Sequence, residues 1–156
     1  MMIRAIRLTR KKAALAVVLL GIVLLLGLLL PTGQSGKAAL PQQPLTDNAA
    51  RLAYLRELGW EVAEEPLTTL QFLLPQELTG DHAAYNALQR TQGFDLEPCC
   101  GKQVIRYTYA VTNYPGQPDG VQLNLYLCED LPVAGDVVCT GAEGFQDTLV
   151  FPTEAG

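Results

Sequence analysis

Hydrophobic residues gather in one unbroken block near the start of the chain. From Ala13 to Leu30 there are eighteen residues with no charge and no hydrogen-bonding side chain. At about 1.5 Å per residue, a helix of this length measures roughly 27 Å, close to the roughly 30 Å hydrocarbon thickness of a membrane. The block therefore predicts a transmembrane signal-anchor helix over residues 13–30.

Charges on either side of this block indicate its orientation. Five basic residues and no acidic residue precede it: Arg4, Arg7, Arg10, Lys11 and Lys12. Only one basic residue, Lys37, follows it within the next twenty residues. Because basic residues next to a span stay in the cytoplasm, residues 1–12 are predicted to be cytoplasmic and the rest of the chain to lie outside the cell membrane.

A cleaved secretory signal is the alternative interpretation of the same segment. Gly36 and Ala38 supply small residues at the spacing that a signal peptidase requires. The apolar block is longer than the roughly 7–15 residues usual for a signal, which favours a single-pass anchor over a secreted protein. In both cases the remainder is extracytoplasmic.

Residues 31–44 have no hydrophobic period. Their sequence, PTGQSGKAALPQQP, is rich in Gly, Pro, Gln and Ser and predicts a flexible linker between the membrane and a domain at 45–152.

The domain is expected to open with a helix from Asp47 to Leu58. Thr46 or Asp47 can cap its start, and Gly59 is the expected stop. Its expected buried face consists of Leu52, Leu55 and Leu58, with Ala49 nearby.

A second helix is expected from Asp81 to Gln92. Asp81 is its expected cap, and Gly93 ends it. Ala84, Tyr85 and Leu88 form its expected buried side.

Short segments with extended character make up most of the remaining domain. The expected strands are Trp60–Glu65, Leu67–Leu74, Gln103–Asn113, Val121–Cys128, Asp136–Thr140 and Phe145–Phe151. Alternation in the fourth of them places Val121, Leu123, Leu125 and Leu127 on one core-facing side. The predicted fold class is α+β, with two helices packed on a mostly antiparallel sheet of about five or six strands.

The charge of the outer part excludes one class of partner. From Pro41 onward there are five basic residues against sixteen acidic ones, a net charge of −11. A phosphate backbone would be repelled, so nucleic-acid binding is not expected.

Four cysteines in an outward-facing domain suggest disulfides: Cys99, Cys100, Cys128 and Cys139. Three pairings are open. A Cys128–Cys139 bridge fits a hairpin but leaves a strained vicinal Cys99–Cys100 bridge, because neighbouring Cα atoms lie only about 3.8 Å apart. Crossed pairings avoid this strain. Free thiols, or a redox or metal role, are the alternatives.

The remaining polar residues do not form a recognisable catalytic or metal-binding set. Adjacent cysteines do not match the paired C-x2-C spacing of structural zinc sites. His82, the single histidine, is expected to face solvent in a first helical turn. The carboxylates of Glu64-Glu65, Glu129-Asp130 and Asp136 are interpreted as solvated groups near turns. No catalytic, cofactor-binding or metal-binding residues are therefore predicted, and no cofactor.

Aromatic residues offer a possible binding face, with packing into the core as the favoured interpretation. The set comprises Trp60, Phe94, Tyr107, Tyr109, Tyr114 and Tyr126. Tyr107 and Tyr109 on one strand are expected to stack with Tyr126 of a neighbouring strand on one side of the sheet.

Four ordered blocks between Arg51 and Phe151 resemble the domain of unknown function 4830 family, found in small membrane-tethered or secreted proteins of Gram-positive bacteria. The blocks are Tyr54–Trp60, Tyr85–Leu96, Gly101-Lys102 with Arg106–Tyr109 and Asn113-Tyr114, and Gly135–Val137. The resemblance implies a domain behind an N-terminal hydrophobic segment, with no established activity, cofactor or catalytic residues. The Cys99-Cys100 pair lies outside the motif.

The predicted position outside the membrane and the lack of predicted catalytic residues lead to one functional hypothesis. The chain is expected to be a non-catalytic binding module of the cell envelope, tethered by residues 13–30, with a protein, peptide or wall component as partner. An envelope thiol-redox protein or small enzyme that uses Cys99 and Cys100 is one alternative. A structural subunit of a membrane complex is the other.

Overall fold

The computed structural model describes residues 39–116, 119–141 and 144–152. The expected basic segment and transmembrane helix lie outside these residues. Within the described ranges, no helix is both long enough and apolar enough to cross a membrane.

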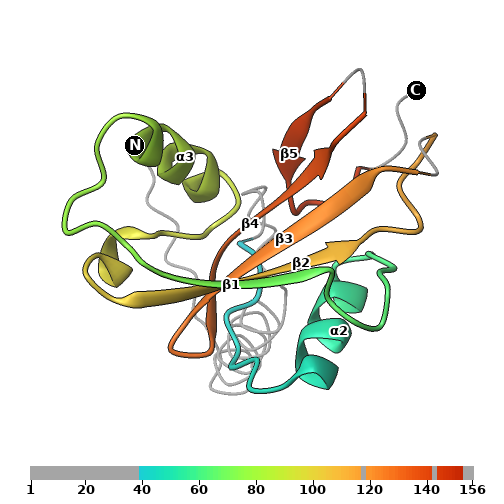
Figure 1. Cartoon of the computed structure of the whole chain (residues 1–156), viewed down its shortest axis with the longest axis horizontal. Helices are drawn as coiled ribbons and strands as arrows, with labels where there is room; N and C mark the ends of the chain where they lie inside the picture. The colour runs from blue at the N-terminus through green and yellow to red at the C-terminus, as the bar shows by residue number, and fades with distance from the viewer. Residues whose placement is uncertain (1–38, 117–118, 142–143, 153–156) are drawn as a thin grey trace, which may run out of the picture. The chain divides into compact units, whose positions relative to one another are not determined.

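The described fold is α+β, as predicted, and its sheet has five antiparallel strands in chain order (Figure 1). The elements are α2 (Asn48–Glu57), β1 (Thr68–Leu73), α3 (Asp81–Arg90), the 3-10 helix η1 (Glu97–Cys99), β2 (Gln103–Ala110), β3 (Val121–Cys128), β4 (Leu131–Cys139) and β5 (Gln146–Thr148). Each strand pairs with the next along the chain, so the sheet is a meander.

The two helices cover opposite faces of this sheet (Figure 1). Leu123 and Leu125 of β3 are fully buried in a core cluster that includes Tyr54 of α2. Side chains alternate along a strand, so Tyr126 points to the other face, where it packs in a second cluster with Tyr85 of α3. Both faces of the central strands are therefore buried.

Local chemistry sets the ends of α2. Asp47 caps it, as predicted, because its Oδ1 accepts a hydrogen bond of 2.7 Å from the backbone N–H of Ala50. Gly59 follows the helix with a φ of +94°, a conformation that glycine adopts without steric cost.

The predicted buried face of α2 is only partly right. Leu55 is buried as expected, but the other buried residues of the helix are Arg51 and Tyr54. Leu52 and Leu58 are half-buried, and Ala49 is exposed. Arg51 is tolerated inside because its Nε donates to the Tyr109 hydroxyl at 3.0 Å.

The segment Trp60–Glu65 is not a strand, contrary to the prediction. A single bridge between Val62 and Val111 connects it to the end of β2. Pro66 has no N–H to donate, which prevents a continuous ladder from Trp60 into β1. Trp60 itself is buried, and its indole N–H donates to the Leu149 carbonyl at 2.8 Å.

Helix α3 differs from its prediction at its start and on its buried side. Gly80, without a side-chain hydrogen bond, precedes the helix, and Asp81 is its first residue rather than its cap. The fully buried residues are polar, Asn86 and Gln89. Of the expected apolar side, Tyr85 and Leu88 are half-buried and Ala84 is exposed.

Strand β3 has the predicted bounds, whereas the other strand ends shift. Strand β2 ends at Ala110, and β5 covers only three residues. Strand β4 begins at Leu131 rather than Asp136, because Glu129 and Asp130 form a tight turn with φ values of +52° and +63°.

Two buried glutamines hold the chain around α3 to the sheet. Gln89 Oε1 accepts from the backbone N–H of Gly135 at 2.9 Å, and Gln92 Nε2 donates to the Gly135 carbonyl at 2.8 Å. Gln92 Oε1 accepts from the N–H of Leu149 at 2.7 Å. These bonds fix the distance between α3 and β4, and this distance determines the space between the helix and the sheet.

The described end of the expected linker contacts the domain. The N–H of Leu40 donates to the Gln92 carbonyl at 3.1 Å. The N–H of Leu45, the first residue of the expected domain, donates to the Asp130 carbonyl at 2.8 Å. Leu45 is buried in the core cluster on the α2 side.

Candidate functional site

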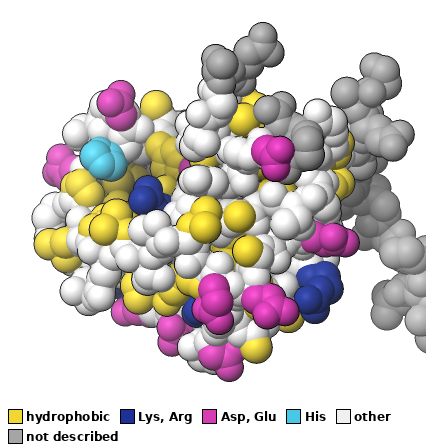
Figure 2. Space-filling model, turned by 45° about the vertical axis from the view of Figure 1, so that its right-hand side comes forward, with side chains coloured by type: hydrophobic (Ala, Val, Ile, Leu, Met, Phe, Trp, Pro, Cys, Tyr) yellow, Lys and Arg dark blue, Asp and Glu magenta, His cyan; other side chains and the backbone are white. Residues whose placement is uncertain are grey.

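A pocket of about 440 Å³ lies between α3 and the sheet face that α3 covers. Its lining residues come from both, and from the segments just after β1 and just before η1: Leu70, Phe72, Leu74, Asp81, His82, Tyr85, Leu96, Arg106, Tyr126, Asp136 and Gln146. In Figure 2, hydrophobic side chains gather beside the histidine, drawn in cyan. The volume is within the roughly 300–1,000 Å³ range of small-ligand sites.

Strand register brings the sheet residues of the pocket together. Leu70 of β1 pairs with Arg106 of β2, and Arg106 pairs with Tyr126 of β3. Directly paired residues share a face, so these three side chains form a row across the sheet. Asp136 of β4 lies on the same face, opposite Asn124.

Asp136 is the most buried charged group of the pocket, with 1% of its surface exposed. Its Oδ2 accepts from the Tyr85 hydroxyl at 2.7 Å and from Gln146 Nε2 at 3.1 Å. Its Oδ1 accepts from Asn124 Nδ2 at 2.7 Å. The interpretation of Asp136 as a solvated group near a turn is wrong, because it lies within β4 rather than in a loop.

The Asp136 network continues into the sheet. Asn124 Oδ1 accepts from the Thr108 hydroxyl at 2.7 Å, which fixes the amide so that its nitrogen faces Asp136. Within the described ranges, the ion pairs are formed by Arg90 and Lys102, and Asp136 is in none of them. Hydrogen bonds from neutral groups therefore stabilise this carboxyl group.

Arg106 supplies the positive charge of the pocket. It is half-buried, and its Nε is buried without a hydrogen-bond partner among the described residues. Arg106 also forms none of the ion pairs of this part of the chain. A guanidinium has five N–H donors in a fixed plane, so Arg106 retains capacity for an acceptor from outside the protein.

Aromatic rings form the wall beside Arg106. The Tyr85 and Tyr126 ring centroids lie 5.9 Å apart, and Phe72 meets Tyr126 edge-on at 6.4 Å. Burial raises the pKa of the Tyr126 hydroxyl and Asp136 raises it further, while hydrogen bonds with Tyr85 and Arg106 lower it. The pKa of Tyr85 is raised by the same two main causes, burial and Asp136, so both phenols are neutral at physiological pH.

The rim of the pocket is formed by the first turn of α3. His82 is exposed there, as predicted, and lines the pocket edge together with the exposed Asp81. The described pocket lining contains no Ser, Thr, Cys or Lys that could act as a nucleophile, and the Tyr85 hydroxyl donates its hydrogen bond to Asp136. The arrangement suits recognition of a molecule with an apolar body and an acceptor group.

The predicted stacking of tyrosines on one side of the sheet is wrong. Tyr107 pairs with Leu125 and Tyr109 with Leu123, which places both on the α2 face. Arg51 lies over the Tyr107 ring at 3.8 Å. Tyr126 pairs with Arg106 and faces α3.

The other aromatic residues of the predicted binding face are core or near-core residues. Trp60 and Phe94 are buried in the α2-side cluster, and the half-buried Tyr114 packs against it. Trp60 and Tyr114 stack with ring centroids 6.1 Å apart.

The cysteines divide between the two ends of the β3–β4 hairpin. Cys128 pairs with Leu131 beside the turn, whereas Cys139 pairs with Val121 at the opposite end. Seven residue steps along a strand cover about 23 Å, far beyond the roughly 7 Å limit for bridged Cα atoms. The geometry therefore contradicts the hairpin pairing of Cys128 with Cys139.

The remaining acidic candidates are surface residues. Glu64 and Glu65 are exposed, and Glu129 and Asp130 form the exposed β3–β4 turn. In the described part of the chain, no three His, Cys, Asp or Glu side chains are grouped as metal ligands.

Arg106 is the site residue that the sequence analysis missed. The strand pattern contained a signal, because Arg106 interrupts the row of alternate side chains between Val104 and Thr108. A basic residue on a buried strand face needs either a partner or a cavity.

No family model, no curated protein and no solved structure matches the chain.

Proposed function

We propose that this chain is a membrane-tethered, extracytoplasmic binding module without catalytic activity, and that the pocket between α3 and the sheet holds part of its partner. The apolar block at 13–30 and the basic residues before it support the tether. One observation carries the binding site: a pocket of about 440 Å³ lined by Arg106, whose Nε lacks a partner among the described residues.

The chemistry of the pocket indicates the part of the partner that it accepts. Phe72, Tyr85 and Tyr126 suit an apolar or aromatic side chain, and the exposed Leu70 extends this surface at the edge. Arg106 suits a carboxylate, which a guanidinium binds through two parallel hydrogen bonds. A peptide with an apolar residue next to a carboxylate, free or in the cell wall, combines both features.

The negative charge of Asp136 does not prevent a carboxylate from binding next to Arg106. Its two oxygens already accept three hydrogen bonds from the protein, so its charge is largely compensated inside the domain. Asp81 lies at the exposed rim, where water screens its charge.

The thiol-redox alternative is less well supported. Burial, and then the hydrogen bond and charge of Cys128, raise the pKa of the Cys99 thiol to about 12. A thiol acts as a nucleophile only as the thiolate, so redox-active cysteines have lowered pKa values.

Binding of a minimal carboxylate ligand tests the proposal. We expect N-acetyl-phenylalanine to shift NMR signals of the pocket residues in the full-length chain in detergent, and N-acetyl-phenylalaninamide to shift them much less. Arg106→Met should weaken binding of the acid at least tenfold, because a hydrogen bond to a charged group contributes about 1.5–3 kcal/mol.

The matched control is Arg56→Met, which removes an exposed arginine on α2, across the sheet from the pocket. This variant should bind the acid as the wild type does. Equal affinities for acid and amide, or an unchanged affinity in a folded Arg106→Met variant, would contradict the proposal.

A further inference from the structure

Cys99 and Cys128 meet in the cluster under η1. Both are buried, with 6% and 3% of their surfaces exposed. They belong to the same apolar cluster, and both line a second pocket of about 290 Å³. Burial, and then the interaction with the Cys128 thiol, raise the pKa of the Cys99 thiol. Lys102 and Glu129, which line the same pocket, form an ion pair of 3.0 Å.

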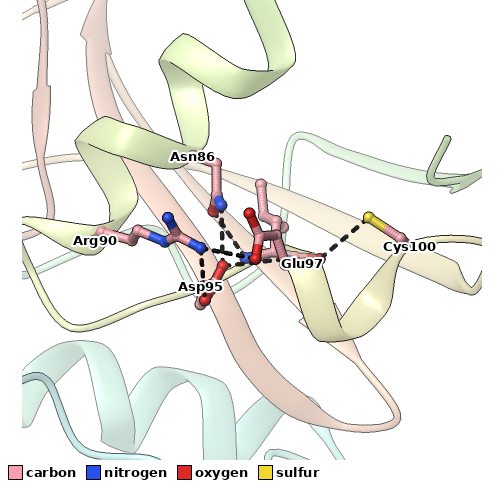
Figure 3. Close-up of polar contacts among 6 residues, drawn as sticks. Asn86, Arg90, Asp95, Glu97 and Cys100 are labelled. Carbon is pink, nitrogen blue, oxygen red and sulfur yellow. Dashed lines mark hydrogen bonds and ion pairs between the residues drawn. The ribbon is translucent and has the colours of Figure 1, made fainter. Parts of the chain in front are cut away.

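A network of polar contacts fixes the segment that carries Cys99 (Figure 3). Asn86 of α3 donates to Asp95 at 2.9 Å and accepts from the N–H of Leu96 at 2.8 Å. Arg90 forms ion pairs with Asp95 at 3.2 Å and Glu97 at 2.9 Å. The segment Asp95–Glu97, directly before Cys99, is therefore held against α3.

The same network separates the two neighbouring thiols. Cys100 points its Sγ at the Leu96 carbonyl, 4.0 Å away, as Figure 3 shows. Cys99, in contrast, shares its apolar cluster and its pocket with Cys128. A vicinal Cys99–Cys100 bridge would need Cα atoms about 3.8 Å apart, below the usual disulfide range.

We infer that Cys99 and Cys128 form a disulfide when the domain folds in an oxidising environment, and that this bridge fastens η1 to the end of β3. The oxidant is a disulfide, such as glutathione disulfide. The thiolate of one cysteine attacks it, forming a mixed disulfide and releasing one glutathione thiolate. The second cysteine, as a thiolate, then displaces the other glutathione thiolate and closes the protein disulfide. Two protein thiols thus lose two protons and two electrons, and one glutathione disulfide is reduced to two thiols.

The geometry also predicts when the bridge forms. Cys99 is buried and its pKa is raised to about 12, so the folded, reduced domain holds very little thiolate at pH 8. Cys128 is buried as well, with 3% of its surface exposed, so a disulfide oxidant has little access to either sulfur in the folded domain. The bridge is therefore expected to close during folding and only slowly afterwards.

Peptide mapping of the full-length chain tests the inference. The chain is reduced, unfolded and then refolded in detergent with a glutathione redox buffer. We expect a Cys99–Cys128 peptide and the loss of two hydrogen masses in wild type, Cys100→Ser and Cys139→Ser. We expect neither in Cys99→Ser or Cys128→Ser. Reduction should lower the thermal midpoint by an amount on the order of 10 °C.

Wild-type mapping decides the result even if a cysteine variant fails to fold. A wild-type bridge that instead involves Cys100, or free thiols at both Cys99 and Cys128 after refolding, would overturn the inference. A bridge that survives in the folded Cys99→Ser variant would overturn it as well. None of these readouts depends on ligand binding, so the result is independent of the proposed function.

Discussion

Asp136 shows how a single residue can connect the helix to the sheet. Its carboxyl group is inaccessible to water and has no cation among its hydrogen-bond partners, so its stability depends on three donors. One donor, Tyr85, belongs to α3, and the other two belong to strands β3 and β5. The carboxyl group therefore needs all three elements in place.

The substitution Asp136→Asn should destabilise the domain although it preserves shape. An amide has one acceptor oxygen and one donor nitrogen, so at least one of the three donors would face an N–H group. We expect the free energy of unfolding to fall by about 2–3 kcal/mol, measured by urea unfolding at pH 7.

The control for this substitution is Glu64→Gln, which makes the same chemical change on an exposed side chain. It should alter the free energy of unfolding by less than about 0.5 kcal/mol. If both variants were equally stable, the network around Asp136 would contribute little.

Residue roles could be predicted from the sequence where they depend on local geometry, and not where they depend on distant partners. The capping role of Asp47 follows from the three residues after it. The burial of Asp136 follows from Tyr85, Asn124 and Gln146, which no local pattern brings together. Arg106 was missed for the same reason, because its row across the sheet depends on strand register.

At the scale of elements, helix limits and helix faces were predicted with different success. Gly59 and Gly93 follow the two helices with positive φ values, a backbone conformation that glycine adopts most easily. A glycine after a helical pattern therefore indicates the end of the helix from the sequence alone. The buried faces contain Arg51, Asn86 and Gln89, which a search for apolar periodicity passes over. Each of them forms a hydrogen bond with a residue outside its own helix, although Gln89 does so only through Oε1, and its Nε2 has no partner among the described residues.

Helix α2 gives a test at this scale. Asp47→Ala removes the acceptor for the Ala50 N–H and leaves a free donor in the first turn. We expect a loss of about 1 kcal/mol in the free energy of unfolding, measured by urea unfolding. Thr46→Ala, at the exposed residue before the cap, is the control and should have a smaller effect. Equal losses in the two variants would argue against the cap.

At the scale of the whole molecule, the antiparallel meander was predictable but the coverage of both sheet faces was not. The alternation in Val121–Cys128 identified one buried face correctly. On the other face, Asn124 and Tyr126 are polar enough to suggest solvent, but α3 and the Asp136 network cover them. Because these residues are polar, the sequence pattern did not indicate that the second face is buried.

Because tyrosines are buried on both sides of the sheet, the whole domain is expected to lose stability at alkaline pH. Burial raises the pKa of Tyr54 on the α2 side, and of Tyr85 and Tyr126 on the α3 side, above the ordinary value of 10.0. Above pH 10 the unfolded chain therefore binds fewer protons than the folded domain. The contribution of these tyrosines to the free energy of unfolding is then expected to be constant below about pH 9 and to fall as the pH rises through 10.

Tyr54→Phe isolates one of these contributions. The Tyr54 hydroxyl is buried and has no hydrogen-bond partner among the described residues, so its removal costs no hydrogen bond there. We expect the variant to be at least as stable as wild type at pH 7, and its stability to fall less steeply between pH 9 and 11, measured by urea unfolding at each pH. Parallel curves for the two proteins would show that Tyr54 ionises equally in both states. The steeper wild-type curve would instead show that the core excludes the charged phenolate, since a buried phenol without a donor has nothing to stabilise that charge.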